Sequence, residues 1–495
     1  MMFSSSLIRV FAGFLCGIAM PFAFAPYHWL GLGMLSLTGL CLLIQQQHPV
    51  LTAYAFGMGW FGVGAWWLAP TVHQYGGLSW WLASLVVVLM GLILACFPAL
   101  WVWICRKLAA WSQLPYALLI LLPSTIIIME WLRGHLFTGL PWTALGNLLL
   151  DTPAVGWLSV LGVYGGALLP VWLAVSLAFL WQKNQRRYAC ISLVLLFAVI
   201  ALTPSIPMPT SEIKKVALIQ PNIPQNQRWN SDVLANTLNT LTQLSADAAP
   251  RVDLIVWPEA AVPFYLSRLP TWHTWLTQQM QPWQTPVLFG GLKYFPKQDI
   301  SQNGLYLFER NDMPEAFVGK HHLVPFGEYI PSWLPWLRKI GVDIGDFSPA
   351  TDIGVLHDAH TYYGSLICYE SLFPEEARER VQQGAEVLIV VTNDAWYGKS
   401  PAAWQHFQAS RVRAVEEGRY VLRAANTGIT AIIAPDGHVT QSTDWWQTST
   451  LIGDYQLAKV KTLYQQWGDM IAILCASLGM MGWLGLSLIT RKQTR

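Results

Sequence analysis

The sequence predicts a membrane-embedded α-helical bundle of eight transmembrane helices joined to one α/β domain, and three features support this prediction. The 495 residues are 54% hydrophobic and 12% charged, about half the charged fraction of an average soluble protein. The apolar residues gather in runs long enough to cross a bilayer. A long polar interval before the last run alternates short β-rich stretches with helical ones, the pattern of an α/β domain.

This composition excludes a disordered tail protein, a coiled coil and an ordinary cytosolic enzyme. The net charge of +2 comes without a basic patch interleaved with aromatic residues, so nucleic acid is not an expected partner. The 27 tryptophans are typical of interfacial anchors, whose rings lie in lipid while the indole N–H reaches the headgroups.

Eight apolar runs have the length that a hydrocarbon core of about 30 Å requires at 1.5 Å per helical residue. The first run follows almost no basic residues and another run succeeds it at once, so we interpret it as a membrane anchor and not as a cleaved signal peptide. The expected spans cover approximately residues 8–26, 28–45, 51–71, 79–105, 115–133, 157–181, 189–204 and 468–490.

Basic residues predict which side each loop occupies. With eight spans, the basic residues near the span ends fall on one side, whereas the opposite short loops hold little beyond Arg133. We therefore expect a multi-pass protein of the bacterial inner membrane with both termini in the cytoplasm. The expected domains are residues 1–204 with seven spans, 205–466 on the periplasmic side, and 467–495 with the eighth span and a cytoplasmic tail. The basic residues are Arg9, Arg106, Lys107, Lys183, Arg186, Arg187, Arg491, Lys492 and Arg495.

Glu130 and Arg133 lie three residues apart near the end of the fifth expected span, so they can pair on one helix face. We expect this pair to snorkel to the membrane interface. The alternative is a polar contact for a lipid headgroup, because ionisable groups in a membrane are often functional.

Beyond Ser211, β-rich runs and helical segments alternate without an internal repeat, which predicts one α/β domain. Pro374 and the two glutamates after it suit a first helical turn, because proline needs no N–H there and acids favour the positive helix end. The expected strands are 216–219, 254–257, 287–290, 305–308, 363–367 and 387–391, and the expected helices are 374–383 and 402–425.

The placement of the cysteines draws attention to one of them. Six of the seven fall within expected spans, where they are most simply small buried hydrophobes, and only Cys368 lies in the polar domain. In an oxidising compartment this thiol has no disulfide partner in its domain, so it is either inert or functional. It lies between an apolar strand and a helix, a turn that exposes a side chain and aims backbone N–H groups at a reacting group. No second cysteine or well-spaced histidine pair accompanies it, so we expect no metal.

A cysteine nucleophile needs a base and a donor that stabilises the oxyanion, and two other motifs hold such residues. Glu259 ends an apolar strand in surroundings that disfavour its charged form and suit it to general base catalysis. Lys320 and Glu328 lie together in a second motif. Each residue alone has an ordinary alternative: a buried structural cysteine, a solvated loop carboxylate or a surface lysine.

Together the three motifs resemble the Glu–Lys–Cys triad of the nitrilase superfamily, which has a carbon-nitrogen hydrolase domain. The motifs are Trp-Pro-Glu-Ala at 257–260, Lys-His-His-Leu-Val-Pro-Phe-Gly-Glu-Tyr at 320–329 and Ile-Cys-Tyr-Glu at 367–370. With seven spans before the domain and one after it, the whole chain resembles the bacterial apolipoprotein N-acyltransferases. One motif alone is weak, but the three in this order and topology are highly specific.

The resemblance implies a four-layer αββα sandwich for the polar domain. It also implies that Glu259 is the general base, Lys320 the oxyanion stabiliser and Cys368 the nucleophile. The supporting positions are Glu328, Glu370, Asn303 and Tyr369, and the aromatic positions around the pocket or its loops are Trp229, Trp396 and Tyr397.

The implied reaction is a two-step acyl transfer with ping-pong kinetics and no cofactor. Cys368 attacks the ester carbonyl of a phospholipid acyl chain, expected at sn-1, and a backbone N–H after the nucleophile helps Lys320 to stabilise the oxyanion. The α-amine of an N-terminal diacylglyceryl-cysteine then attacks the thioester. The expected partners are a phospholipid donor, an apolipoprotein acceptor and membrane lipids, and we expect a monomer.

Both substrates carry acyl chains that leave a bilayer reluctantly, at about 0.8 kcal/mol per buried methylene, so the site must lie at the membrane surface. Residues 329–340 combine Trp333 and Trp336 with Arg338 and Lys339, a composition suited to the lipid interface. We expect a mobile arm at the lipid entrance, and an ordinary packed loop is the alternative.

Two other functions stay open at this point. A membrane-tethered amidase could use the same triad on a soluble amide, because the triad determines the nucleophile rather than the acyl donor, although eight spans exceed the need of a tether. The other is a transporter or receptor whose outer domain only binds. Few intramembrane charges and the absence of paired broken helices in the sequence pattern argue against transport.

Overall fold

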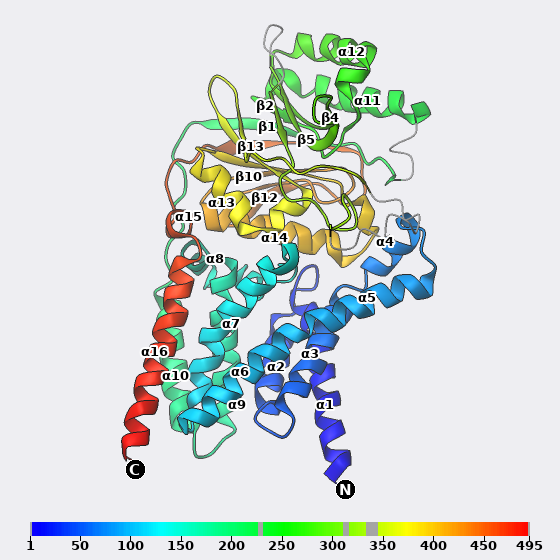
Figure 1. The fold of residues 1–495 in the computed structure, drawn as a ribbon. Coiled ribbons are helices and arrows are strands. Elements are labelled where there is room, and N and C mark those ends of the chain that lie inside the picture. Colours follow the sequence, from blue (N-terminus) through cyan, green and yellow to red (C-terminus); the bar gives the residue numbers. More distant parts are fainter. Residues whose placement is uncertain (1, 226–230, 310–315, 333–344, 494–495) are drawn as a thin grey trace. The chain divides into compact units, whose positions relative to one another are not determined.

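The computed structural model describes residues 2–225, 231–309, 316–332 and 345–493, and the chain divides into two compact units (Figure 1). The helical unit comprises Met1–Gln74, Leu78–Ser205 and Gln466–Arg495. The α/β unit comprises Tyr75–Gly77 and Ile206–Gln465 and holds two β-sheets.

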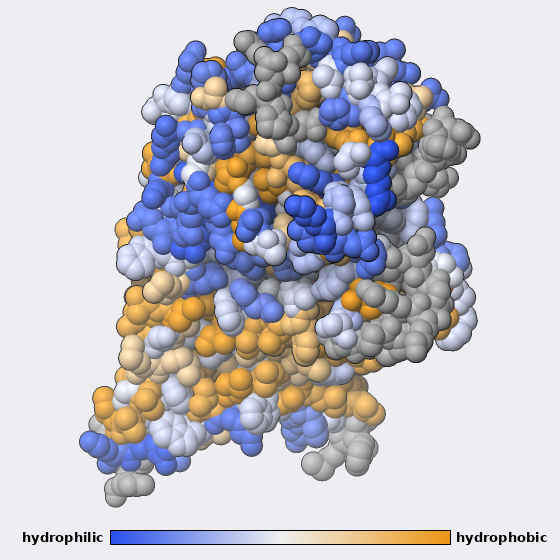
Figure 2. Space-filling model, turned by 45° about the horizontal axis from the view of Figure 1, so that its top comes forward, coloured by the Kyte–Doolittle hydropathy of each residue, from blue (hydrophilic) through white to orange (hydrophobic). Residues whose placement is uncertain are grey.

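The helical unit exposes large apolar side chains over its outer surface. Val194 is 69% exposed and Leu474 is 55% exposed, and apolar side chains cover this unit in Figure 2, whereas the α/β unit is largely hydrophilic. An apolar surface of this extent is suited to lipid rather than to water. The helices are α1 Met2–Ala19, α2 Leu30–Leu43, α3 Pro49–Gly64, α4 Leu68–Tyr75, α5 Trp80–Leu94, α6 Cys96–Ser112, α7 Ala117–His135, α8 Leu158–Gly166, α9 Leu168–Leu180, α10 Arg186–Ala201 and α16 Met470–Gln493.

Four helical segments among the described residues are long and apolar enough to cross a membrane, and the bent pair α8–α9 makes a fifth if it counts as one span. The other three expected spans coincide with α2, α3 and α10, which have 14, 16 and 16 residues. At 1.5 Å per residue these helices measure only about 21 to 24 Å. Helix length and composition therefore establish four or five candidate spans and not eight. The four segments are Ser6–Ala23, Trp80–Ser112, Ala117–Thr138 and Met470–Lys492.

Two expected spans are not single straight helices. The span expected at 79–105 divides at Ala95 into α5 and α6. The span expected at 157–181 bends by 73° between α8 and α9. Pro170 lies in the first turn of α9, where a proline is tolerated because the N–H groups of a first turn have no partner within the helix.

Glu130 and Arg133 form a buried ion pair within α7. Arg133 Nη2 lies 2.8 Å from Glu130 Oε2, and the two residues are 2% and 4% exposed. The prediction that the pair snorkels to the interface is therefore wrong. Burial on this scale also keeps a lipid headgroup away from both charges.

The ion pair satisfies the backbone of the irregular segment that follows α7. Arg133 Nη1 donates to the carbonyl oxygens of Leu140 and Trp142 at 2.6 and 2.9 Å, and Glu130 Oε2 accepts from the N–H of Leu145 at 3.0 Å. All residues from 141 to 150 are buried. Because unpaired backbone groups are costly away from water, this pair allows non-helical chain inside the unit.

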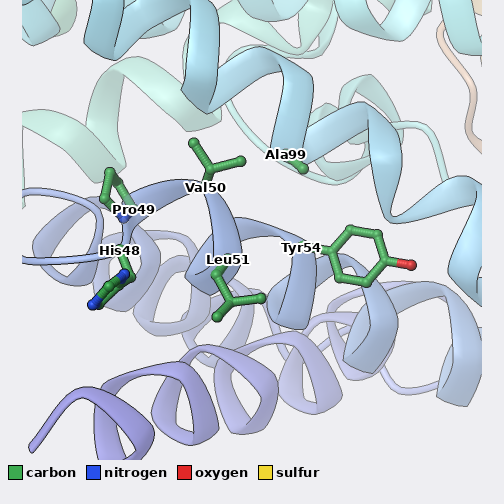
Figure 3. Close-up of a pocket in the computed structure, with 6 residues that line it drawn as sticks. All are labelled: His48, Pro49, Val50, Leu51, Tyr54 and Ala99. Atoms are coloured by element: carbon green, nitrogen blue, oxygen red, sulfur yellow. The ribbon is translucent and has the colours of Figure 1, made fainter. Parts of the chain in front are cut away.

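A hollow of about 420 Å³ opens on the helical unit beside α3 (Figure 3). The Tyr54 hydroxyl at its edge donates to the carbonyl of Leu92 at 3.2 Å. The lining side chains include no carboxylate, thiol or amine, so this hollow is not where the predicted chemistry can occur. They are His48, Pro49, Val50, Leu51, Tyr54 and Ala99.

The α/β unit contains a seven-stranded and a six-stranded sheet. The first has the order β13-β1-β2-β4-β5-β6, with β3 paired to β4, and the second has the order β12-β11-β10-β9-β8-β7. β1, β2 and β4 are parallel, with β13 and β5 antiparallel on either side of them. β8, β9 and β10 are also parallel, with β7 and β11 antiparallel on either side. The strands are β1 Ile213–Gln220, β2 Leu254–Val256, β3 Val262–Tyr265, β4 Val287–Phe295, β5 Ile300–Phe308, β6 Ala316–Gly319, β7 Val355–His357, β8 Tyr362–Ile367, β9 Val387–Thr392, β10 Val421–Ala425, β11 Ala431–Ile433, β12 Val439–Ser442 and β13 Ser449–Gln456.

Helices cover the outer face of each sheet, while the two inner faces pack on each other (Figure 1). Side chains of β1 and β8, such as Leu218 and Ile367, meet in the core between the sheets. Every residue of β9 is buried, as expected for a parallel strand that is covered on both faces. These four layers are the αββα sandwich that the resemblance implies. The helices are α11 Ser231–Ala246 and α12 Pro270–Met280 on the first sheet, and α13 Pro374–Gln382 and α14 Pro401–Glu417 on the second.

The helix expected at 402–425 is too long at its C-terminal end. α14 ends at Glu417, and the last five residues of the expected helix form β10. Gly418 follows with φ +61°, a left-handed conformation that suits glycine and ends the helix. Residues 421–425 then pair with β9 in the sheet, where pairing outweighs local helix propensity.

Replacing Arg133 by methionine should destabilise the helical unit, because Glu130 would become an unpaired buried charge and two carbonyl oxygens would lose their donor. The expected loss is about 3–5 kcal/mol of unfolding free energy. Thermal unfolding of the full chain in detergent measures it. Arg186→Met removes an exposed guanidinium and serves as the matched control. Equal unfolding midpoints for the two variants would contradict the role of the pair.

Candidate active site

Cys368 occupies a strained turn between β8 and a short 3₁₀ helix, Cys368–Leu372. Its φ is +52°, a conformation that costs energy for any residue with a β-carbon. The Glu370 carboxylate accepts the N–H of Ile367 at 2.7 Å and so ties the turn back to the strand. This geometry resembles the strained nucleophile turns of α/β enzymes, which present a side chain at the end of a strand.

Glu259 lies just beyond the carboxyl end of β2, with 7% of its surface exposed. Its Oε1 accepts from Asn303 Nδ2 at 2.9 Å, and its Oε2 accepts from the N–H of Asn393 at 3.0 Å. A β-carbon on Gly290 would lie 2.4 Å from the nitrogen of Ala260, so only glycine lets β4 approach this turn. The alternative of a solvated loop carboxylate is therefore wrong.

Lys320 follows β6 and is 1% exposed, so the alternative of a surface lysine is also wrong. Its Nζ lies 2.9 and 2.8 Å from the two oxygens of Glu328 and 3.7 Å from Glu259 Oε1. Burial by itself lowers the pKa of Lys320, but the two carboxylates outweigh it and raise the pKa overall. The side chain is thus held as an ammonium ion.

The thiol of Cys368 is protonated at rest. Burial raises its pKa well above the usual value, the charge of Glu259 raises it further, and Lys320 opposes the shift. Because Glu259, Lys320 and Cys368 affect one another's pKa, the three predicted triad residues lie near one another, at the carboxyl ends of strands from two different sheets. The arrangement holds a buried thiol, a carboxylate that can take its proton and a fixed cation.

Glu328 and Glu370 form hydrogen bonds with the loop that carries Lys320. Glu328 Oε2 accepts the N–H of Val324 at 2.7 Å, and Asn303 Nδ2 lies 3.4 Å from Glu328 Oε1. Glu370 Oε1 accepts the N–H of His321 at 2.7 Å. Glu370 therefore joins the Lys320 loop to the turn of Cys368.

Some of the aromatic residues predicted near the site lie in the part of the chain that the structure describes. Tyr369 is buried, with its ring 4.9 Å from that of Phe373. Tyr397 has a pKa raised by burial and then by Cys368, so it lies near the nucleophile. Trp396 beside it is 37% exposed. Trp229, Trp333 and Trp336 lie outside the described residues, as does most of the expected arm.

Three functional candidates were missed by the sequence argument: Asp394, His406 and Arg423. Asp394 is the second residue after the buried strand β9, and a polar residue at that position was a signal that could have been used. His406 and Arg423 lie within α14 and β10, where nothing local distinguishes them. All three are at most 1% exposed. Among the described residues, no group of three or more His, Cys, Asp or Glu side chains is placed to hold a metal ion.

Comparison with known protein families identifies the class to which the chain belongs. The family model described as carbon-nitrogen hydrolase matches residues 215–465, which contain the whole candidate site. A second model, described as the apolipoprotein N-acyltransferase N-terminal domain, matches residues 16–176. The chain belongs to the apolipoprotein N-acyltransferase family.

Curated relatives align with this chain over nearly its full length. The apolipoprotein N-acyltransferase of Nitrosomonas europaea is 34% identical, with 96% of each chain covered. That of Haemophilus ducreyi is 31% identical, covering 96% of this chain and 97% of the relative. That of Methylococcus capsulatus is 35% identical, with 93% of each chain covered.

The electrostatic arrangement predicts that Lys320→Met makes the resting thiol less acidic, because the variant removes a charge that lowers the pKa of Cys368. At a fixed pH near 8, iodoacetamide should alkylate Cys368 several-fold more slowly than in the wild type, since the thiolate is the nucleophile. Mass spectrometry of the Cys368 peptide measures the rate, and Cys368→Ala controls for labelling elsewhere. Alkylation of Lys320→Met at the wild-type rate or faster would contradict the arrangement.

Proposed function

We propose that the chain transfers an acyl group from a phospholipid to the N-terminal α-amine of a diacylglyceryl-cysteine on an apolipoprotein. One observation carries the proposal: Glu259, Lys320 and Cys368 converge at the strand ends of the sandwich in a chain that aligns with apolipoprotein N-acyltransferases over its length. An acyltransferase of this kind matures lipoproteins.

In the first step, Cys368 attacks the ester carbonyl of the phospholipid. Because the resting thiol is protonated, its proton must leave as the carbon–sulfur bond forms. Glu259 takes the proton, and the hydrogen bonds from Asn303 and from the backbone of Asn393 hold the carboxylate in place. The ester oxygen leaves with a proton as lysophospholipid, and a thioester on Cys368 remains.

Lys320 stabilises the oxyanion of the tetrahedral intermediate. Its ammonium ion is already desolvated and oriented by Glu328, so little reorganisation is needed when negative charge develops. The N–H of Tyr369, which follows the nucleophile, is the second donor. Glu370 supports both groups, because it joins the Lys320 loop to the Cys368 turn.

In the second step, the free α-amine of the apolipoprotein attacks the thioester. Glu259 accepts a proton from the attacking nitrogen, the thiol is regenerated, and an amide forms. Two half-reactions that share one covalent intermediate give ping-pong kinetics. A monomer suffices for this scheme, because all three triad residues come from one chain.

The decisive experiment traps the acyl-enzyme in liposomes of defined phospholipids. Wild-type protein should gain one acyl mass on the Cys368 peptide, and Cys368→Ala should gain none. Glu259→Gln and Lys320→Met should each slow acylation about 10²–10⁴-fold, because they remove the base and the oxyanion stabiliser. Intact mass spectrometry over time measures the rates.

The second substrate separates the transferase from an amidase. A diacylglyceryl-cysteine lipopeptide with a free α-amine should discharge the thioester, and the same peptide with an acetylated α-amine is the matched control. Discharge by water at the same rate would refute the transferase, and absence of any adduct would refute the triad mechanism.

We further propose that the protein crosses a bacterial inner membrane eight times, with both termini in the cytoplasm and residues 205–466 in the periplasm. The seven spans lie within residues 1–204, and the eighth lies within residues 467–495. Both termini lie at the same end of the helical unit, as an even number of crossings requires (Figure 1). The charge bias of the loops supports this orientation.

The orientation predicts which positions a membrane-impermeant thiol reagent reaches in intact cells. Single cysteines placed at Lys183 and at Lys492 should be protected until the membrane is permeabilised, whereas one at exposed Lys399 in the catalytic domain should react at once. Labelling of a chain without its native cysteines gives the measurement. Immediate reaction at Lys183 would contradict the proposed orientation.

A further inference from the structure

A buried polar cluster lies directly behind the nucleophile and takes no part in the steps above. It consists of His406 on α14, Ser371 in the turn of Cys368, Asp394 after β9 and Arg423 on β10. Each residue is at most 1% exposed. Polar groups buried so deeply are costly unless they are paired, so the contacts of this cluster show what it holds.

The cluster is centred on the backbone carbonyl of Cys368. His406 Nε2 lies 2.9 Å from the Cys368 oxygen, and the Ser371 hydroxyl donates to the same oxygen at 2.9 Å. His406 Nε2 also lies 2.8 Å from Ser371 Oγ. Two side chains therefore converge on a single carbonyl oxygen.

The contact with the carbonyl requires a hydrogen on Nε2 of His406, because a carbonyl oxygen can only accept. Nδ1 faces Asp394 Oδ1 at 2.9 Å, and Asp394 Oδ2 in turn accepts from Arg423 Nη2 at 2.7 Å. The imidazole ring therefore contacts the Cys368 carbonyl and Ser371 through Nε2, and Asp394 through Nδ1, while Arg423 in turn pairs with Asp394.

The carbonyl in question belongs to the peptide unit that supplies the second oxyanion donor. In a trans peptide the C=O of Cys368 and the N–H of Tyr369 point in opposite directions. Anchoring the oxygen on the His406 side therefore turns the N–H to the other side. Because Cys368 is held at φ +52°, this peptide plane would otherwise relax toward a less strained orientation.

We propose that His406 is a positioning residue that fixes the Cys368–Tyr369 peptide unit so that the Tyr369 N–H points at the developing oxyanion. A donor on the carbonyl also polarises the peptide unit and strengthens its N–H as a donor. Ser371 shares the anchoring, while Asp394 and Arg423 orient the ring. This inference rests on the proposed acyl transfer and assigns a role that the triad does not include.

The test compares two reactions of the same thiol, because only one of them needs an oxyanion donor. Acylation by phospholipid passes through an oxyanion, whereas alkylation by iodoacetamide does not. His406→Phe keeps a ring but removes the N–H, and it should slow acylation about 10- to 100-fold. Alkylation of Cys368 should stay within about threefold of the wild type, because that reaction does not use the anchored peptide unit.

Conservative variants keep the test decisive if His406→Phe does not fold. His406→Gln retains an N–H that can reach the Cys368 oxygen, so its acylation rate should lie between those of the wild type and His406→Phe. Ser371→Ala removes one of two anchors and should slow acylation by a smaller factor. His438→Gln, at an exposed histidine in the same domain, is the matched control and should leave both rates unchanged.

Equal losses of acylation and alkylation in His406→Gln and Ser371→Ala would overturn the inference, because they would indicate displacement of the nucleophile itself. Wild-type acylation in these variants would overturn it as well. Failure of the wild type to form any acyl-enzyme would instead refute the proposed function. The two results are distinguishable because the first requires a functioning wild-type reaction.

Discussion

The pairing of one buried ammonium ion organises the rest of the candidate site. Lys320 is 1% exposed, and an unpaired charge so deep in a protein would cost several kcal/mol. The chain must therefore fold back so that Glu328 pairs with Lys320. Glu259, at the end of another strand, lies with its Oε1 3.7 Å from Lys320 Nζ. Burial raises the pKa of the Cys368 thiol, and the same carboxylate of Glu259 raises it further, so the pairing also affects the thiol.

A second layer of contacts holds Cys368 in a conformation that it would not adopt alone. Cys368 is strained at φ +52°, and strain of this kind persists only where the surroundings over-determine the backbone. Glu370 restrains the residue before Cys368 and the loop after Lys320, while Ser371 and His406 restrain the carbonyl of Cys368. The turn of Cys368 is thus tied to a loop that follows a strand of the other sheet.

The helical unit also pairs its buried polar groups with one another. Its outer surface is apolar, and its buried ion pair, Glu130 with Arg133, is used to satisfy the backbone of an irregular segment. The low charge of the whole chain is therefore an average over two units. One is suited to lipid, and the other holds most of the charged side chains.

The sequence by itself determined the two environments, six of the thirteen described strands and the motifs of Glu259, Lys320 and Cys368, because hydropathy and residue type are local properties. It could not determine that the run 421–425 is a strand, since its partner β9 lies 30 residues earlier in the chain. It did not indicate His406 or Arg423, whose importance lies only in what they contact. It also placed Arg133 at an interface, whereas the structure buries it. Which polar groups are paired is decided by contacts between distant residues, and only the tertiary structure contains them.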